Sequence, residues 1–122
     1  MLLITDNDAL LAFCKRLAGT HYITIDTEFL REKTYWPQLC LVQIANDDNS
    51  AVIDALAPGI DLSPVFDILI DTSVIKVFHA ARQDMEIFFN LMGKLPTPIF
   101  DTQIAAMVCG FGDSVGYEQL VT

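Results

Sequence analysis

The chain has 122 residues, of which 52% are hydrophobic and 19% are charged, and this length suits one domain with a hydrophobic core. Its formal net charge of −9 argues against a broad basic surface for duplex nucleic acid. A nucleic-acid enzyme is not excluded, because bound cations reverse the local sign of a carboxylate site.

Predicted helices and strands alternate along the chain. In chain order we expect a helix over residues 5–19, strands over 21–29, 38–45 and 50–56, a helix over 63–71, a strand over 73–79, a helix over 81–91, a short extended piece from 98, a helix over 101–110, and a last helix that starts near 116. The turn at residues 46–49 makes the second and third strands a hairpin. This order predicts an α/β sheet with antiparallel and parallel parts.

Capping residues mark the expected helix ends. Thr5 and Asp8 have the spacing of a capping box, and Ser63 followed by Pro64 reads as an N-cap with proline at N1. Asp101 reads as the N-cap of the helix that follows it, and we favour this role over metal binding. The expected stops are Gly19, Gly93 and Gly110.

No apolar run approaches the roughly 18 residues that would cross a membrane, and the polar N-terminus is unlike a signal peptide. The three cysteines are Cys14, Cys40 and Cys109, and none is part of a CxxC pair. They read as buried thiols of a reducing compartment. We therefore expect a cytoplasmic protein without a membrane segment.

Two carboxylates end the strand predicted over residues 21–29. Residues two apart in a strand point to the same face, so Asp26 and Glu28 are neighbours with Cβ atoms roughly 7 Å apart. Like charges at this separation raise each other's pKa unless a cation lies between them. Either both side chains lie in water past the sheet edge, or they share a metal ion.

A third acid lies on a predicted core-facing stripe of the helix over residues 81–91. Asp84 starts a stripe whose other positions are apolar, namely Ile87, Phe88 and Leu91. A carboxylate there either meets the helix dipole in the first turn or needs a partner. With Asp26 and Glu28 it completes the kind of oxygen donor set that Mg²⁺ or Mn²⁺ prefers.

Five blocks of the sequence form an ordered motif set. They are "IDTEF" at 25–29, "TYWPQLCLVQIA" at 34–45, "HAARQD" at 79–84, "FDTQIAA" at 100–106 and "GYEQLV" at 116–121. This set closely resembles the ribonuclease D family of the DEDD 3′–5′ exonuclease superfamily. The resemblance implies a ribonuclease H-like mixed sheet flanked by helices. It also implies two divalent metals, Mg²⁺ or Mn²⁺, that hydrolyse the 3′-terminal phosphodiester of single-stranded RNA.

The resemblance assigns roles to three carboxylates. It makes Asp26 and Glu28 metal ligands of the first motif and Asp84 the acid of the second. Asp26 would sit between the two metals. Glu28 would bind one metal and lie near the attacking water or the terminal nucleotide.

The resemblance further implies a third motif, a tyrosine shortly before a last aspartate, which this sequence lacks. Tyr117 is followed by Glu118, and no aspartate comes after it. We therefore expect residues 1–122 to be a partial 3′–5′ exonuclease domain, truncated before its last helices. Such a chain should be nearly inactive alone, and an uncovered apolar surface should favour a homodimer.

Six residues near the motifs are our predicted substrate contacts: Thr27, Phe29, Arg31, Tyr35, His79 and Gln103. The aromatic and basic residues after the first motif suit base stacking and phosphate contact, or they form a solvated loop with its aromatics in the core. His79 either lies beside the site or is a core histidine bonded to backbone. Gln103 reaches either substrate or solvent.

Two classes of function remain open from the sequence. The first is a metal-dependent 3′–5′ exoribonuclease of RNA processing, such as tRNA 3′ maturation, by resemblance. The second is a non-catalytic module that binds nucleic acid or protein and retains the exonuclease fold. The intact first two motifs favour the enzyme.

Overall fold

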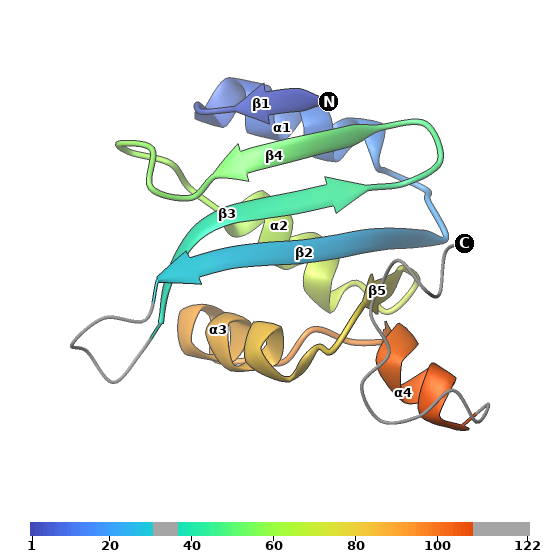
Figure 1. Ribbon diagram of the computed structural model, residues 1–122. Helices are drawn as coiled ribbons and strands as arrows, with labels where there is room; N and C mark the ends of the chain where they lie inside the picture. The colour runs from blue at the N-terminus through green and yellow to red at the C-terminus, as the bar shows by residue number, and fades with distance from the viewer. Residues whose placement is uncertain (31–36, 109–122) are drawn as a thin grey trace.

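The computed structural model describes residues 1–30 and 37–108, in which six strands form one mixed sheet in the order β1-β4-β3-β2-β5-β6 (Figure 1). In chain order the elements are β1 (Leu2–Ile4), α1 (Asn7–Arg16), β2 (Tyr22–Leu30), β3 (Gln38–Ala45), β4 (Ser50–Asp54), α2 (Ser63–Ile70), β5 (Ile75–Phe78), α3 (Arg82–Met92), β6 (Ile99–Asp101) and α4 (Thr102–Val108). The predicted α/β class is confirmed.

Both kinds of strand pairing occur in this sheet, as expected. Strand β3 runs antiparallel to β2 on one side and to β4 on the other, which confirms the predicted hairpin. The β1–β4, β2–β5 and β5–β6 pairs are parallel. The β2–β3 register places Asp26 opposite Gln43 and is irregular just after Glu28.

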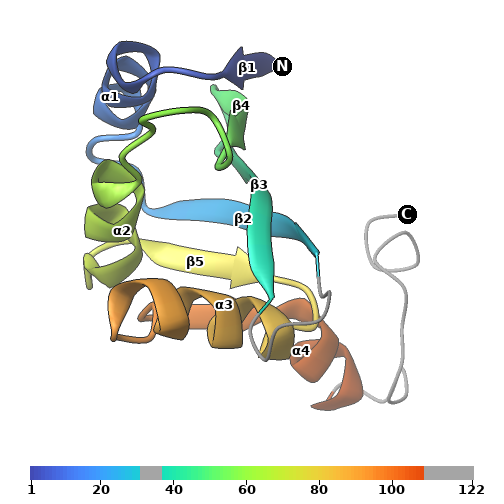
Figure 2. The ribbon, with the colours of Figure 1, turned by 90° about the vertical axis from the view of Figure 1, so that its left-hand side faces the viewer.

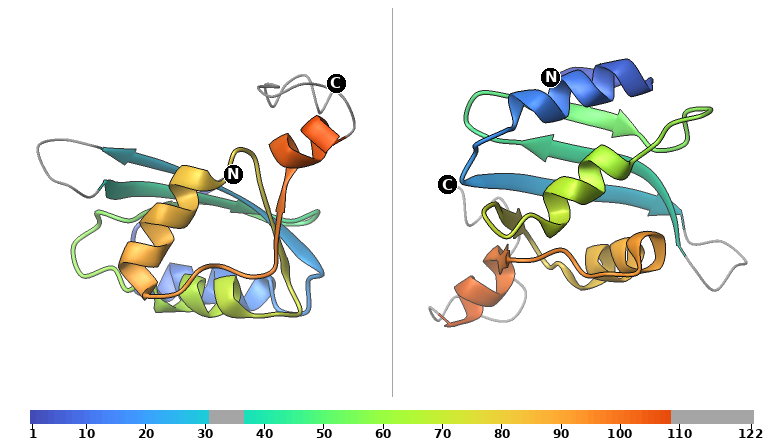
Figure 3. Two further views of the ribbon diagram at one scale, coloured as in Figure 1. Left: turned by 90° about the horizontal axis from the view of Figure 1, so that it is seen from below. Right: turned by 180° about the vertical axis from the view of Figure 1, so that it is seen from behind.

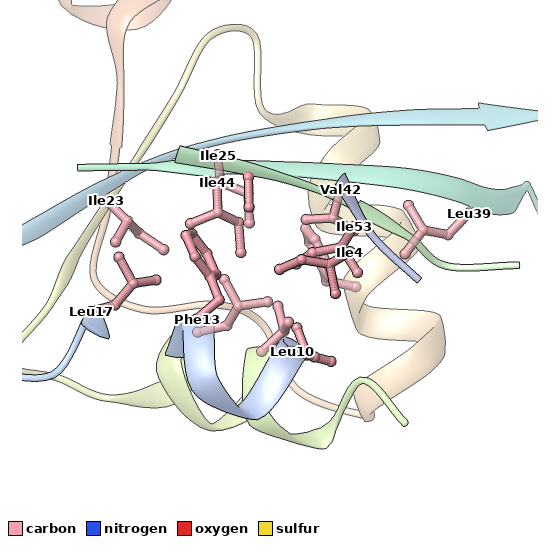
Figure 4. Close-up of a cluster of buried hydrophobic side chains, with 14 of the residues drawn as sticks. Ile4, Leu10, Phe13, Leu17, Ile23, Ile25, Leu39, Val42, Ile44 and Ile53 are labelled. Carbon is pink, nitrogen blue, oxygen red and sulfur yellow. The ribbon is translucent and has the colours of Figure 1, made fainter. Parts of the chain in front are cut away.

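Helices α1 and α2 cover one face of the sheet (Figure 2). The strands send apolar side chains to this face, where Ile23, Ile44 and Ile53 pack toward Leu10 and Phe13 of α1 (Figure 4). All five are essentially buried. Burying a side chain of this size contributes about 1.5–3 kcal/mol, so this layer holds β2 in a fixed orientation.

Helices α3 and α4 lie near the β5 end of the sheet, whereas α1 and α2 lie side by side along its strands (Figure 3). Helix α3 ends where Gly93 adopts φ = 72°, a conformation that glycine reaches without a Cβ clash, so the predicted stop is confirmed. The predicted stop at Gly110 and the helix predicted from 116 lie outside the described residues.

Several predicted helix ends were wrong. Asp6, not Thr5, is the N-cap of α1, because its carboxylate accepts the N–H of Ala9 at 2.8 Å. Helix α2 starts at Ser63, whose hydroxyl donates to Asp61 and does not cap the helix. Helix α1 ends at Arg16, ahead of Gly19, which lies in the turn that follows.

In α1 the buried residues are Leu10 and Phe13, and Leu17 just after the helix end is also buried. The stripe predicted for α3 needs correction at its last position. That stripe ends early, because Ile87 and Phe88 are buried but Leu91 is 50% exposed. Short β1 was not predicted, because three residues are too few to show strand alternation.

Exposed apolar side chains gather on β5, β6 and α4: Ile75, Ile99, Phe100, Ile104 and Met107. Self-association through such a surface stays a prediction. Cys14 and Cys40 are partly buried free thiols, less enclosed than expected, and Cys109 lies outside the described residues. Among the helices that the structure describes, none is long and apolar enough to cross a membrane.

Candidate active site

The two strand carboxylates share a face of β2, as predicted. Along this strand Ile25 and Thr27 are buried on the side of α1 and α2, whereas Asp26 and Glu28 are exposed on the opposite side. An Oδ1 oxygen of Asp26 accepts the N–H of Thr27 at 2.9 Å. The alternation that builds the core therefore also places both acids on the open face.

Asp84 lies in the first turn of α3 and is 8% exposed, so its predicted burial is confirmed. The hydroxyl of Thr27 donates a hydrogen bond to Oδ1 of Asp84. Thr27 itself is 8% exposed and lies between the two strand acids. This contact joins the first and second motifs through the strand residue that points inward.

The environment of Asp84 favours its protonated form. Burial raises the pKa of this carboxyl to about 6, from an ordinary value of 3.8. The hydrogen bond from Thr27 opposes this rise, whereas the negative charges of Asp26 and Asp101 add to it. Asp84 therefore lies within electrostatic reach of two other acids, and a cation among them would stabilise its ionised form.

The three predicted metal ligands are not gathered into a formed metal site. Within residues 1–30 and 37–108, no group of three or more His, Cys, Asp or Glu side chains lies close enough to hold a metal ion. Asp26 and Asp84 interact electrostatically, and Glu28 is exposed farther along β2. Metal binding by these residues stays a prediction.

A groove of about 510 Å³ runs over the open face of the sheet beside Asp26. Its lining comes from β2, β3, β5 and the start of α4: Thr24, Ile25, Asp26, Gln43, Ala45, Val77, Phe78, His79 and Thr102. Most of these side chains are uncharged. The groove could therefore accept a polar ligand while Asp26 supplies the charge at one point of its wall.

His79 lies at the end of β5 and lines the same groove as Asp26. Its Nδ1 atom is 2.7 Å from the hydroxyl oxygen of Thr102, and that hydroxyl donates to the carbonyl of Phe78 at 3.2 Å. Because a threonine hydroxyl has one hydrogen, Nδ1 of His79 is the donor in the first contact. His79 therefore lines the groove with Asp26 and bonds to the side chain of Thr102.

Asp101 was predicted to cap α4, and this role is confirmed, but the prediction missed a second set of contacts. Its Oδ1 accepts the N–H groups of Gln103 at 2.9 Å and Ile104 at 3.4 Å. The same carboxylate also accepts the N–H groups of Ala80 at 3.0 Å and Ala81 at 2.8 Å. Partial burial raises the pKa of Asp101, but the four N–H donors outweigh burial, and the pKa lies below its ordinary value.

The other predicted substrate contacts are spread around this corner. Phe29 is half-buried and packs against the core, which suits one of its two predicted roles. Gln103 is half-buried in the first turn of α4. Arg31 and Tyr35 lie outside the described residues. Their contacts with substrate stay predictions, as do those of Thr27 and His79.

Comparison with known proteins places this arrangement in a family. The family model described as 3′–5′ exonuclease matches residues 1–122. Ribonuclease D of Jannaschia sp. is 61% identical in an alignment of 122 positions, which covers 97% of this chain and 32% of that protein. The chain thus spans about a third of the length of the curated relatives it matches.

Two solved structures are similar in fold. The crystal structure of Escherichia coli RNase D, an exoribonuclease involved in structured RNA processing, matches with a TM-score of 0.90 and 43% identity, over 98% of this chain and 32% of that chain. Brucella melitensis NrnC with bound Mg²⁺ matches with a TM-score of 0.75 and 26% identity, over 98% of this chain and 60% of that chain. Because the family model matches residues 1–122, the chain belongs to the 3′–5′ exonuclease family.

Proposed function

We propose that the protein containing this chain is a metal-dependent 3′–5′ exoribonuclease that shortens RNA from its 3′ end. Family membership and the likeness to E. coli RNase D support this reaction class. The observation that carries the proposal is the pairing of Asp26 with Asp84 beside the groove. These acids come from separate motifs, yet the negative charge of Asp26 on β2 reaches Asp84 on α3 and adds to the effect of burial on its pKa.

The donor set fits Mg²⁺ or Mn²⁺ as the cofactor. Asp26, Glu28 and Asp84 offer carboxylate oxygens, which these hard cations prefer over nitrogen or sulfur. Burial is the main cause of the raised pKa of Asp84, and the negative charges of Asp26 and Asp101 add to it, so a bound cation would offset both effects. The exposed side chains of Asp26 and Glu28 are able to change rotamer toward such a cation at small cost.

A divalent cation bound here would supply two kinds of chemistry, lowering the pKa of a bound water and neutralising charge on the phosphate. The residues of the chain prepare the site for it. Thr27 donates its hydroxyl to one oxygen of Asp84 and so fixes the orientation of that carboxylate. Asp26 and Glu28 stay on the solvent side of β2, where a phosphodiester has access.

The proposed substrate is the unpaired 3′ end of an RNA. The chain carries a net charge of −9, which argues against a broad basic surface that would attract the phosphates of a duplex. A single strand instead offers bases and ribose hydroxyls to an uncharged wall such as that of the groove. We therefore expect stepwise shortening without sequence preference and a stall at stable duplex. Processing of tRNA 3′ ends is one role for such an activity.

A further carboxylate is needed for two metals, since three acids leave one ion with few charged ligands. We propose that the longer protein supplies it, because the relatives are about three times as long as this chain. The 122-residue chain should accordingly be nearly inactive alone. Positioned acid–base help is by itself typically worth about 10²–10⁴-fold in rate.

The test is cleavage of a 5′-labelled single-stranded RNA by a version of the protein extended to the length of its relatives. We expect a ladder of 3′-shortened products with Mg²⁺ or Mn²⁺, and none with EDTA. Asp26→Asn should remove the ladder. Asp8→Asn is the matched control, because Asp8 lies in the first turn of α1, and α1 covers the face of the sheet opposite to the side chain of Asp26 (Figure 2).

The alternative function, a non-catalytic binding module, predicts a different outcome of the same assay. Such a module would retain the labelled RNA on a native gel without shortening it, with or without metal. Endonucleolytic products would contradict the proposed direction of cleavage. Activity in Asp26→Asn equal to that in Asp8→Asn would contradict the proposed site.

A further inference from the structure

Asp101 connects two elements that meet at the end of β5. Its carboxylate accepts N–H groups from the turn before α3, at Ala80 and Ala81, and from the first turn of α4, at Gln103 and Ile104. Three of these donors share Oδ1, and Ala81 alone donates to Oδ2. Four backbone contacts from two elements argue for a role in holding the backbone.

The turn that Asp101 holds has an unusual backbone. Ala80 adopts φ = 56°, which is uncommon for a residue with a Cβ and costs free energy that other contacts must offset. Both N–H groups at this point, those of Ala80 and Ala81, donate to Asp101. Asp101 therefore stabilises the very conformation that the side chain of Ala80 disfavours.

This turn decides where Asp84 lies. Ala81 is the N-cap residue of α3, and its carbonyl accepts the N–H of Met85, so the turn leads directly into the helix that carries Asp84. Asp84 then meets Thr27 of β2. A change in the turn would shift the start of α3 relative to β2, and with it the distance from Asp84 to Asp26.

We propose that Asp101 is a positioning residue for the nuclease site, which acts on Asp84 through the turn at residues 79–81. This inference rests on the proposed function, because it assigns a part of that same site. Capping of α4 alone does not account for the contacts, since Oδ2 faces Ala81 and not α4. Asparagine has only one acceptor oxygen, so Asp101→Asn must present an NH₂ group to one of these N–H donors.

The first measurement is Mn²⁺ binding by calorimetry to the chain, the Asp101→Asn variant and a matched control, Asp61→Asn. Asp61 likewise accepts a backbone N–H and a hydroxyl, both from Ser63, but it precedes α2 on the opposite face of the sheet. Loss of a residue that supports a metal ligand typically weakens metal affinity about 10–100-fold, and we expect the lower end for Asp101→Asn. Asp61→Asn should bind Mn²⁺ like the wild type.

A rescue variant separates positioning from general stability. Glycine adopts positive φ at no steric cost, so Ala80→Gly in the Asp101→Asn background should recover part of the Mn²⁺ affinity. In the extended protein, Asp101→Asn should lower kcat for RNA and leave KM nearly unchanged. A merely structural role predicts neither the recovery nor the selective loss of kcat.

Each outcome decides the proposal. If the wild type binds no Mn²⁺ and cleaves no RNA, the proposed function fails, and the inference fails with it. If the wild type does both and folded Asp101→Asn matches Asp61→Asn, only the inference is overturned. Asp101→Glu, which keeps the charge but moves the oxygens, is the second variant if Asp101→Asn does not fold. Wild-type affinity in that variant, or no recovery with Ala80→Gly, also overturns the proposal.

Discussion

Asp84 and Asp101 are two carboxylates at helix starts in the same corner of the molecule, and their surroundings are opposite. Asp101 accepts four backbone N–H groups, and its pKa lies below the ordinary value. Asp84 is buried with the hydroxyl of Thr27 as a donor, and its pKa rises to about 6. The fold thus fixes one acid in its ionised form and leaves the other ready to take up a proton or a cation.

The difference predicts which acid is structural and which is functional. A carboxylate that accepts several backbone N–H groups is held in its ionised form and stabilises the folded chain. A carboxylate that burial penalises in its ionised form costs stability, and that cost is typical of functional sites. Each experiment below either breaks this contrast or makes it quantitative.

The largest expected effect is on RNA cleavage by the extended protein. Asp84→Asn should lower the rate at least about 10³-fold, because a metal ligand contributes several kcal/mol to charge stabilisation and each 1.36 kcal/mol is a factor of ten. Asp101→Asn should lower it only about tenfold, as expected of a supporting residue. The measurement is the initial rate of 3′ shortening at saturating Mg²⁺. Equal losses in the two variants would remove the contrast.

The next effect is on the stability of the chain as a function of pH without metal. The pKa of Asp84 is raised to about 6 in the folded state from 3.8, so the folded state binds more protons between these values. Stability should therefore fall as pH rises from about 4 to about 6 and then level off. A shift of this size corresponds to about 3 kcal/mol, as an upper figure.

Asp84→Asn should abolish this fall in stability, since it is neutral at every pH and still accepts from Thr27. At pH 7 in EDTA the variant should be more stable than the wild type, and at pH 4 the two should be similar. Urea unfolding at both pH values measures the difference. A less stable variant at pH 7 would show that the charge of Asp84 is not the source of the cost.

A smaller effect should follow from adding metal at pH 7. Mn²⁺ at about ten times its Kd would stabilise the wild type by about 1.4 kcal/mol through binding to the folded state. The Asp84→Asn variant should gain much less, because it lacks the carboxylate that would bind the ion. Thermal unfolding with Mn²⁺ and with EDTA makes the comparison, with Asp8→Asn as the variant expected to respond like the wild type.

Much of this fold was open to prediction because its signals are local. Alternation in β2 placed Asp26 and Glu28 on one face, and the stripe in α3 turned Asp84 inward. The "NDDN" turn at 46–49 set the hairpin of β3 and β4. These features depend on residue spacing within one element, and such spacing is visible without any knowledge of tertiary contacts.

The rest depends on contacts between elements that are distant in the chain. The hydrogen bond from Thr27 to Asp84 spans 57 positions, and those from Ala80 and Ala81 to Asp101 span 21 and 20. Nothing in the sequence marks Ala80 as a residue with positive φ, since alanine rarely adopts it. The sequence shows Asp101 as the cap of the helix that follows it. Its contacts with Ala80 and Ala81 are visible only in the folded structure.

The smallest effect tests the other half of the contrast, the stability that Asp101 contributes. Because its folded pKa is lowered, this contribution is present above the unfolded value near 3.8 and is lost as pH falls through the lower folded pKa. Asp101→Asn should therefore cost stability at pH 7 by about 1 kcal/mol, since one oxygen acceptor is lost in a partly solvated site. The gap to the wild type should stay constant from pH 7 to pH 5 and narrow below pH 4, where the wild-type carboxyl itself takes up a proton. Urea unfolding at pH 7, 5 and 3 follows the gap, and a gap that widens toward acid would mean that Asp101, like Asp84, is held with a raised pKa.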